Sequence, residues 1–150
     1  SEGGRIYIVT TVCKARRAVF DSRAAAEAVI GEIELRTREG CCESLCFVVM
    51  PDHVHWMLQL SHHECLSRIV ARTKGRSAVQ VNRFLQRRGA LWQAGFHDHA
   101  VRRDEDLENL ANYIVLNPVR GGLVARPEDY PYSWSRFAVA GKPSGKTSVM

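Results

Sequence analysis

The sequence lacks the features that mark membrane, secreted and disulfide-bonded proteins. No apolar run approaches the ~20 residues that a membrane-spanning helix needs, and the N-terminus has no basic segment followed by an apolar one. The five cysteines are odd in number and form no C-x-x-C pair, which favours reduced structural thiols over disulfides or a zinc site. We therefore expect a cytoplasmic protein with no membrane association.

The length and composition are those of an ordinary globular protein. With 150 residues, 45% hydrophobic and 25% charged, the chain can bury one core, and it shows no internal repeat. The last ten residues are small and polar. We expect one domain over residues 1–140 and a flexible tail over residues 141–150.

The positive charge is unevenly distributed. Between Leu66 and Arg103 there is a single acid, Asp98, although the net charge of the whole chain is only +5. The basic residues of this segment are Arg68, Arg72, Lys74, Arg76, Arg83, Arg87, Arg88, Arg102 and Arg103. A concentration of one sign predicts a polyanionic partner, most simply a nucleic acid.

The hydrophobic pattern predicts alternating strands and helices. Strands are expected over 5–12, 45–50 and 53–60, with a fourth at the end of 91–102; helices are expected over 22–39, from a capping box at 61–64 onward, and from the acidic 104–106 to Pro118. The first six elements follow the split βαβ, or ferredoxin-like, order. The fold class predicted is α+β, an antiparallel sheet covered on one face by two helices, with an additional C-terminal helix that carries Tyr113.

Part of the basic segment falls on one side of the second predicted helix. Arg68, Arg72 and Arg76 recur every four residues with no glutamate between them, which favours a phosphate-facing surface over a merely solvated one. Further along, Trp92, Phe96, His97 and His99 alternate with polar residues. Such aromatic side chains can stack on unpaired bases, although Trp92 is equally compatible with a place in the core.

Two histidines one residue apart are the strongest chemical signal. Successive side chains of a strand point to opposite faces, so His53 and His55 share a face and can bind one metal ion, although such pairs also occur in strands without a ligand. Tyr113 lies off the apolar stripe of its helix, with Asn117 one turn further on the same side. If that helix covers the free face of the sheet, a metal held by His53, His55 and Asn117 could polarise a phosphodiester while Tyr113 attacks it. Mg²⁺ or Mn²⁺ is the expected ion.

Three segments in order carry a family resemblance. MPDHVH (50–55), WQAGFHDH (92–99) and YIVLNPVRGGLV (113–124) together resemble the REP-associated tyrosine transposases, which belong with the single-tyrosine HUH transposases of bacterial insertion sequences. Where the family commonly has Asn and Ala, this chain has Asp52 and Gly121. Asp52 adds a negative charge near the expected metal.

The resemblance implies a metal-dependent nuclease and strand transferase for single-stranded DNA. Such proteins recognise repetitive extragenic palindromes folded as hairpins and cut beside them, leaving a 5′-phosphotyrosine and a free 3′-hydroxyl. By position, His53, His55 and Asn117 match the metal ligands, and Tyr113 matches the nucleophile. We add the basic loop residues Arg16 and Arg17, and Arg120 near the tyrosine, to the DNA-contacting set, and we expect the protein at the nucleoid.

Two other functions remain open at this stage. The protein could be a non-catalytic DNA or RNA hairpin-binding protein with a vestigial site, although the His, His, Tyr, Asn set is complete. It could also serve rolling-circle replication or conjugative nicking, but those nucleases usually use a third histidine and attached domains. A monomer is slightly preferred over a homodimer.

Overall fold

A computed structural model describes residues 4–137 of the chain. The expected flexible tail over 141–150, and the boundary of the domain at 140, lie outside the described residues. None of the helices within residues 4–137 is long and apolar enough to cross a bilayer.

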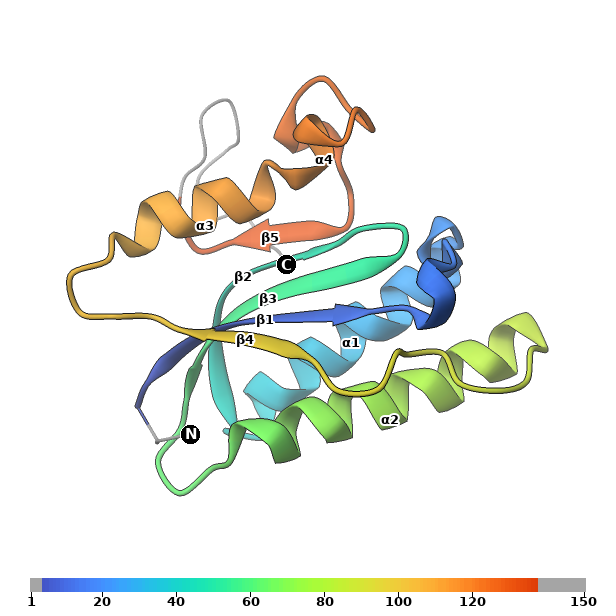
Figure 1. The fold of residues 1–150 in the computed structure, drawn as a ribbon, viewed down its shortest axis with the longest axis horizontal. Helices are drawn as coiled ribbons and strands as arrows, with labels where there is room; N and C mark the ends of the chain where they lie inside the picture. The colour runs from blue at the N-terminus through green and yellow to red at the C-terminus, as the bar shows by residue number, and fades with distance from the viewer. Residues whose placement is uncertain (1–3, 138–150) are drawn as a thin grey trace.

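The centre of the molecule is a five-stranded antiparallel sheet in the order β4-β1-β3-β2-β5 (Figure 1). The strands are β1 (Ile6–Val12), β2 (Cys42–Val49), β3 (His53–Leu60), β4 (His97–Ala100) and β5 (Ser133–Ser135). The first four strands have the order expected for a split βαβ fold, so this prediction is confirmed. Strand β5 was not predicted, because three residues are too short to show an alternating pattern.

Helices cover both faces of this sheet (Figure 1). On one face lie α1 (Arg23–Arg38) and α2 (Leu66–Leu85), and on the other lie α3 (Leu107–Val115) and the short α4 (Asn117–Arg120). Short 3₁₀ turns occur at Lys14–Arg16, Val19–Asp21 and Pro127–Asp129. The helix that carries Tyr113 therefore packs on the face left free by the ferredoxin-like unit, as expected.

The alternation along β3 divides the core into two layers. Val54, Trp56 and Leu58 are buried in the cluster beneath α1 and α2. Met57 belongs to the other cluster, which includes Ile114 of α3. Because the side-chain period of a strand is two, the odd-numbered residues of β3 all face the α3 side.

The start of α2 differs from the prediction. Cys65, not Ser61, is the N-cap residue, and the helix begins at Leu66. His63 has a φ of +67°, a left-handed conformation that interrupts the backbone between Ser61 and the helix. The prediction of a capping box at 61–64 is therefore wrong. The apolar residues Val79, Phe84 and Leu85 near the end of α2 are exposed.

A buried ionic network joins α1 to α2. Glu32 (4% exposed) and Arg36 (0% exposed) lie within the helix pair, with Arg36 Nη2 at 3.3 Å from Glu32 Oε1. From α2, Arg76 Nε donates to Glu32 Oε1 at 3.0 Å and Gln80 Nε2 donates to Glu32 Oε2. Arg72 Nη2 lies 3.3 Å from Glu39 Oε2 at the end of α1. Arg72 and Arg76 of α2 thus have acidic partners, but these come from α1 and not from α2.

Candidate active site

The paired histidines lie at the start of β3, on the face that carries α3. Their ring centroids are 4.8 Å apart in a T-shaped arrangement. On the neighbouring strand, Val12 lies directly opposite His53, and Thr10 lies directly opposite His55. Since opposite residues of an antiparallel pair point to the same face, Thr10 and Val12 border the histidine pair.

Each imidazole is held through its Nδ1 atom. His53 Nδ1 lies 2.7 Å from Asp52 Oδ1, and His55 Nδ1 lies 2.8 Å from the hydroxyl oxygen of Thr10. Metal-binding histidines are typically oriented in this way, by a carboxylate or other polar group on the second ring nitrogen. Across residues 4–137, no hydrogen bond occupies the Nε2 atom of either ring, so both are available to one ion.

The electrostatic environment keeps these groups in the forms that suit a metal. Burial, aided by the charges of His53 and Arg120, lowers the pKa of His55 to about 4, so the ring is neutral at physiological pH. Burial alone would raise the pKa of Asp52, but the hydrogen bond to His53 and the charges of His53 and Arg16 outweigh it, and the net shift is downward. Arg16 Nε lies 3.2 Å from Asp52 Oδ2.

Helix α3 presents Tyr113 toward solvent while its opposite side packs on the sheet. Asp106 caps the helix by accepting a hydrogen bond from the Asn109 backbone, and Ala111 and Ile114 are buried against β2. Tyr113 is 64% exposed, and the guanidinium of Arg120 lies 3.8 Å from the centroid of its ring. The charge of Arg120 also contributes to the lowered pKa of His55, so this arginine is near both the tyrosine ring and that histidine.

Asn117 begins α4, directly after the break at Leu116 that ends α3. Its Nδ2 donates to the Ile114 carbonyl at 2.9 Å, which leaves its side-chain oxygen free to accept or to bind a cation. A Cβ atom added at Gly121 would lie 3.3 Å from the Asn117 carbonyl oxygen and 3.5 Å from Met50 Cε, so α4 packs closely on the end of β2. The Met50 N–H bonds the His53 carbonyl at 2.8 Å, which brings this end of β2 to the first histidine.

This donor set fits a divalent ion. Within the described part of the chain, no three His, Cys, Asp or Glu side chains gather in a way that could hold a metal. An ion at the histidine pair would therefore need the Asn117 oxygen, solvent or substrate to complete its coordination. Two imidazoles with an amide oxygen suit Mn²⁺ or a later transition metal better than Mg²⁺.

The sheet is open beside the histidines. Helix α3 packs on β2 and β5, while Ile6, Ile8, Thr10 and Val12 of β1 are only half-buried on this face. Strand β4, at the edge, is largely exposed. An extended strand of substrate can lie on this uncovered part of the sheet.

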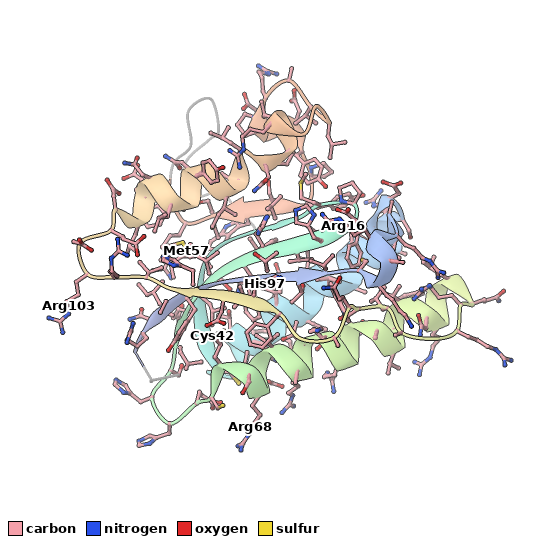
Figure 2. All side chains as sticks on the ribbon, in the orientation of Figure 1. Arg16, Cys42, Met57, Arg68, His97 and Arg103 are labelled. Atoms are coloured by element: carbon pink, nitrogen blue, oxygen red, sulfur yellow. The ribbon has the colours of Figure 1, made fainter. Side chains whose placement is uncertain are left out.

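Most of the predicted DNA-contacting residues of α2 lie on the opposite side of the sheet. Arg68, Arg72, Lys74, Arg76 and Arg83 belong to α2, and Arg87 and Arg88 follow it. Figure 2 shows Arg68 projecting from α2 away from the sheet. The Nζ of Lys74 donates to the carbonyls of Gln93 at 3.0 Å and Gly95 at 2.5 Å, a structural role. As predicted, α2 has no acid between its basic residues, but Arg72 and Arg76 pair with Glu39 and Glu32 of α1.

The aromatic segment divides between core and surface. Trp92 is 8% exposed, and its Nε1 donates to the Lys74 carbonyl at 3.1 Å, so the core alternative holds for this residue. His97 is exposed on β4 and lies opposite Thr10 (Figure 2). His99 Nε2 lies 3.0 Å from Glu105 Oε1.

Other basic residues predicted to contact DNA lie at the two ends of the uncovered part of the sheet. Arg102 and Arg103 follow β4 and line an open hollow of about 590 Å³ with Arg5, and Arg102 also pairs with Asp104 at 3.3 Å. Arg103 lies at the end of the molecule opposite Arg16 (Figure 2). Arg17 is exposed in the loop that carries Arg16. The structure thus brings Arg16, Arg120 and His97 to the histidine site, with Arg102 and Arg103 further along the sheet.

The sequence did not reveal the residues that orient the histidines. Thr10 is 45 residues from His55, and only the register of β1 against β3 brings them together. Asp52 was noticed as a nearby charge, but not as the partner of His53 Nδ1. Its position next to a candidate ligand was the available signal.

Two histidines share one face of a split βαβ sheet, and the helix that carries Tyr113 packs against that same face, which is the arrangement expected from the resemblance to tyrosine transposases. Residues 4–117 match the family model described as "Transposase IS200 like", and the chain belongs to this family. The resemblance inferred from the three sequence segments is therefore confirmed.

Within this family the chain is similar to REP-associated tyrosine transposases. It is 29% identical over 144 residues to one from Haemophilus influenzae, covering 87% of this chain and 79% of the relative. It is 32% identical over 91 residues to one from Escherichia coli K12, covering 58% and 50%.

Solved structures give the same picture. A REP-associated tyrosine transposase bound to a REP hairpin aligns with a TM-score of 0.69 and 25% identity, covering 87% of this chain and 76% of that one. A transposase from Deinococcus radiodurans aligns with a TM-score of 0.55 and 23% identity, covering 65% and 79%, and supports the fold.

Proposed function

We propose that this transposase is a metal-dependent single-strand DNA endonuclease and strand transferase that binds hairpin DNA and cleaves it through Tyr113. The hairpin substrate is suggested by the relative whose structure is bound to a REP hairpin. The observation that carries the proposal is the orientation of the two imidazoles, each held at Nδ1 with its Nε2 free.

The proposed chemistry is one transesterification and its reversal. The phenolic oxygen of Tyr113 attacks the scissile phosphorus, a P–O bond to tyrosine forms, and the P–O3′ bond breaks. The tyrosine proton passes to solvent, and the departing 3′-oxygen is protonated to a hydroxyl. Attack of a 3′-hydroxyl on the phosphotyrosine rejoins DNA and restores the phenol, so no external energy source is needed.

The other residues of the site would stabilise charge on the phosphate and hold the imidazole rings. A divalent ion held by His53, His55 and Asn117 would supply Lewis-acid stabilisation of the phosphate charge. Arg120, within cation–π distance of Tyr113, supplies a guanidinium for the same phosphate. Thr10 and Asp52 hold the imidazole rings in place.

The test is cleavage of labelled single-stranded hairpins with Mn²⁺ or with a chelator. We expect cutting and a covalent protein–DNA product only with the ion. Tyr113→Phe should give no product. Its hairpin affinity should stay within about threefold of wild type, because a lone hydroxyl contributes little to binding. Tyr132→Phe is a matched control, since Tyr132 packs against the core cluster beneath α1 and α2, on the other face of the sheet. Unchanged cleavage by Tyr113→Phe would contradict the proposal. Binding without cleavage by the wild type would favour a hairpin-binding protein.

A further inference from the structure

A small pocket opens on the face of the sheet that carries the paired histidines, between β1 and the segment that precedes β4. Its volume is about 180 Å³, and it is lined by Thr10 and Val12 of β1 and by the residues from Gln93 to His97. Pockets for drug-sized ligands usually measure roughly 300–1,000 Å³, so this one suits a single small planar group.

The pocket is formed by extra residues opposite β1. The Gln93 N–H bonds the Val12 carbonyl at 2.8 Å, and the regular ladder resumes where His97 lies opposite Thr10. Residues 94–96 are left to bulge outward around the gap. Lys74 of α2 fixes the shape of the bulge by donating hydrogen bonds to the carbonyls of Gln93 and Gly95.

This pocket adjoins the histidine pair. The two β1 residues that line it, Thr10 and Val12, are the residues directly opposite His55 and His53. Neighbouring strands lie about 4.8 Å apart, so the pocket begins one strand from the proposed metal ligands. A phosphodiester at the histidines would place an adjacent nucleotide over it.

The lining is suited to a neutral, hydrogen-bonding ring. It contains no Lys or Arg side chain, which disfavours a phosphate. The side-chain amide of Gln93 and the ring of His97 make no hydrogen bond within residues 4–137, and both side chains are exposed at the rim. Glutamine amides recognise base edges by paired hydrogen bonds.

We infer that this pocket binds the base of a nucleotide that flanks the scissile phosphate, with Gln93 and His97 selecting which base is accepted. The inference rests on the proposed function and adds a specificity site to it. The base is unpaired, because a pocket of about 180 Å³ is too small to admit a base pair.

The test uses the full chain with Mn²⁺ and a pool of single-stranded oligonucleotides that carry randomised hairpin stems and randomised flanks. Both cleavage fragments are sequenced, so the bases on either side of the cut are read directly. The variants are Gln93→Ala and His97→Ala. The matched controls are Gln59→Ala, at the far end of β3, and His62→Ala, in the turn after β3.

Wild type should prefer one base at one flanking position by roughly 5- to 100-fold, the range expected for recognition of a base edge. Gln93→Ala should remove most of this preference, with total cleavage of the pool changed less, and the controls should keep it. An abasic nucleotide at that position should slow wild type more than Gln93→Ala.

The outcomes separate this inference from the proposed function. Cleavage with the same base preference in Gln93→Ala and His97→Ala as in wild type overturns the inference alone. Cleavage by wild type with no preference at either flanking position does the same. No ion-dependent cleavage of any member of the pool overturns the proposed function and the inference with it.

Discussion

At the residue scale, Asp52 shows how a departure from a family pattern can be accommodated. The carboxylate accepts a hydrogen bond from His53 Nδ1 and forms an ion pair with Arg16, so each of its oxygens has a partner. An asparagine oxygen could accept the same hydrogen bond from His53. The exchange therefore preserves the orientation of the ring and adds an ion pair with the basic loop.

Removing this partner should weaken metal binding. We expect Asp52→Ala to lower the affinity for Mn²⁺ about 10- to 100-fold, as is typical when the group that orients a ligating histidine is lost. Asp52→Asn should retain most of the affinity, and Asp98→Ala, on the opposite face of β4, should not change it. Titration of Mn²⁺ by electron paramagnetic resonance without DNA gives these values. Wild-type affinity in Asp52→Ala would show that His53 is not a ligand.

Arg120 contacts the ring of Tyr113, and its charge contributes to the lowered pKa of His55. Arg120→Ala should lower the cleavage rate about 100- to 1,000-fold, the usual cost of losing one preorganised group that stabilises developing charge. Arg120→Lys should recover part of the rate, since it retains the charge but not the planar fork. Single-turnover cleavage at saturating hairpin separates the rate from binding. Arg126→Ala, an exposed arginine paired with Glu128, is the control, and equal rates for all variants would contradict this role.

At the scale of elements, the local sequence predicts a helix or strand well and predicts its partners poorly. Strand β3 was expected over the residues where it occurs, because alternation and the Pro51-Asp52 turn are local signals. The acids that pair with α2 come from α1, more than 30 residues earlier, and no pattern within α2 could reveal them. The same limit applies to Trp92, whose neighbours in the core come from distant segments.

The buried network between α1 and α2 should matter for stability. Glu32→Ala leaves the fully buried Arg36 with Glu39 alone, and loss of one partner of a buried ion pair costs about 3–5 kcal/mol. Arg72→Ala removes only an exposed pair and should change the free energy of unfolding by less than about 1 kcal/mol. Urea denaturation measures both. A cost below about 1 kcal/mol for Glu32→Ala would show that the network is not stabilising.

At the scale of the whole molecule, the sheet separates two functions. The α1–α2 layer and its core support the sheet from one side (Figure 1). The histidines, the helix that carries Tyr113 and the uncovered parts of β1 and β4 share the other side. The sequence predicted this arrangement, because the element order left one helix for the second face. It could not predict the bulge before β4, which depends on the register of that strand against β1.

The two basic regions should differ in their contribution to binding. Arg102 and Arg103 follow β4 beside the uncovered part of the sheet, whereas Arg72 and Arg76 belong to α2 on its other face. Changing Arg102 and Arg103 together to alanine should flatten the slope of log affinity against log salt by about two units, one for each lost phosphate contact. Changing Arg72 and Arg76 should flatten it by less than about one unit. The reverse order, measured by fluorescence anisotropy with a labelled hairpin, would place the DNA on α2.

The central claim is that Tyr113 forms the covalent bond to DNA at the histidine pair. Its most direct test is isolation of the protein–DNA product formed with Mn²⁺, followed by proteolysis and mass spectrometry of the nucleotide-bearing peptide. The account predicts a phosphotyrosyl linkage at Tyr113, present in wild type and absent when His53 and His55 are both changed to alanine. A linkage at another residue, or one that persists without the two histidines, would contradict it.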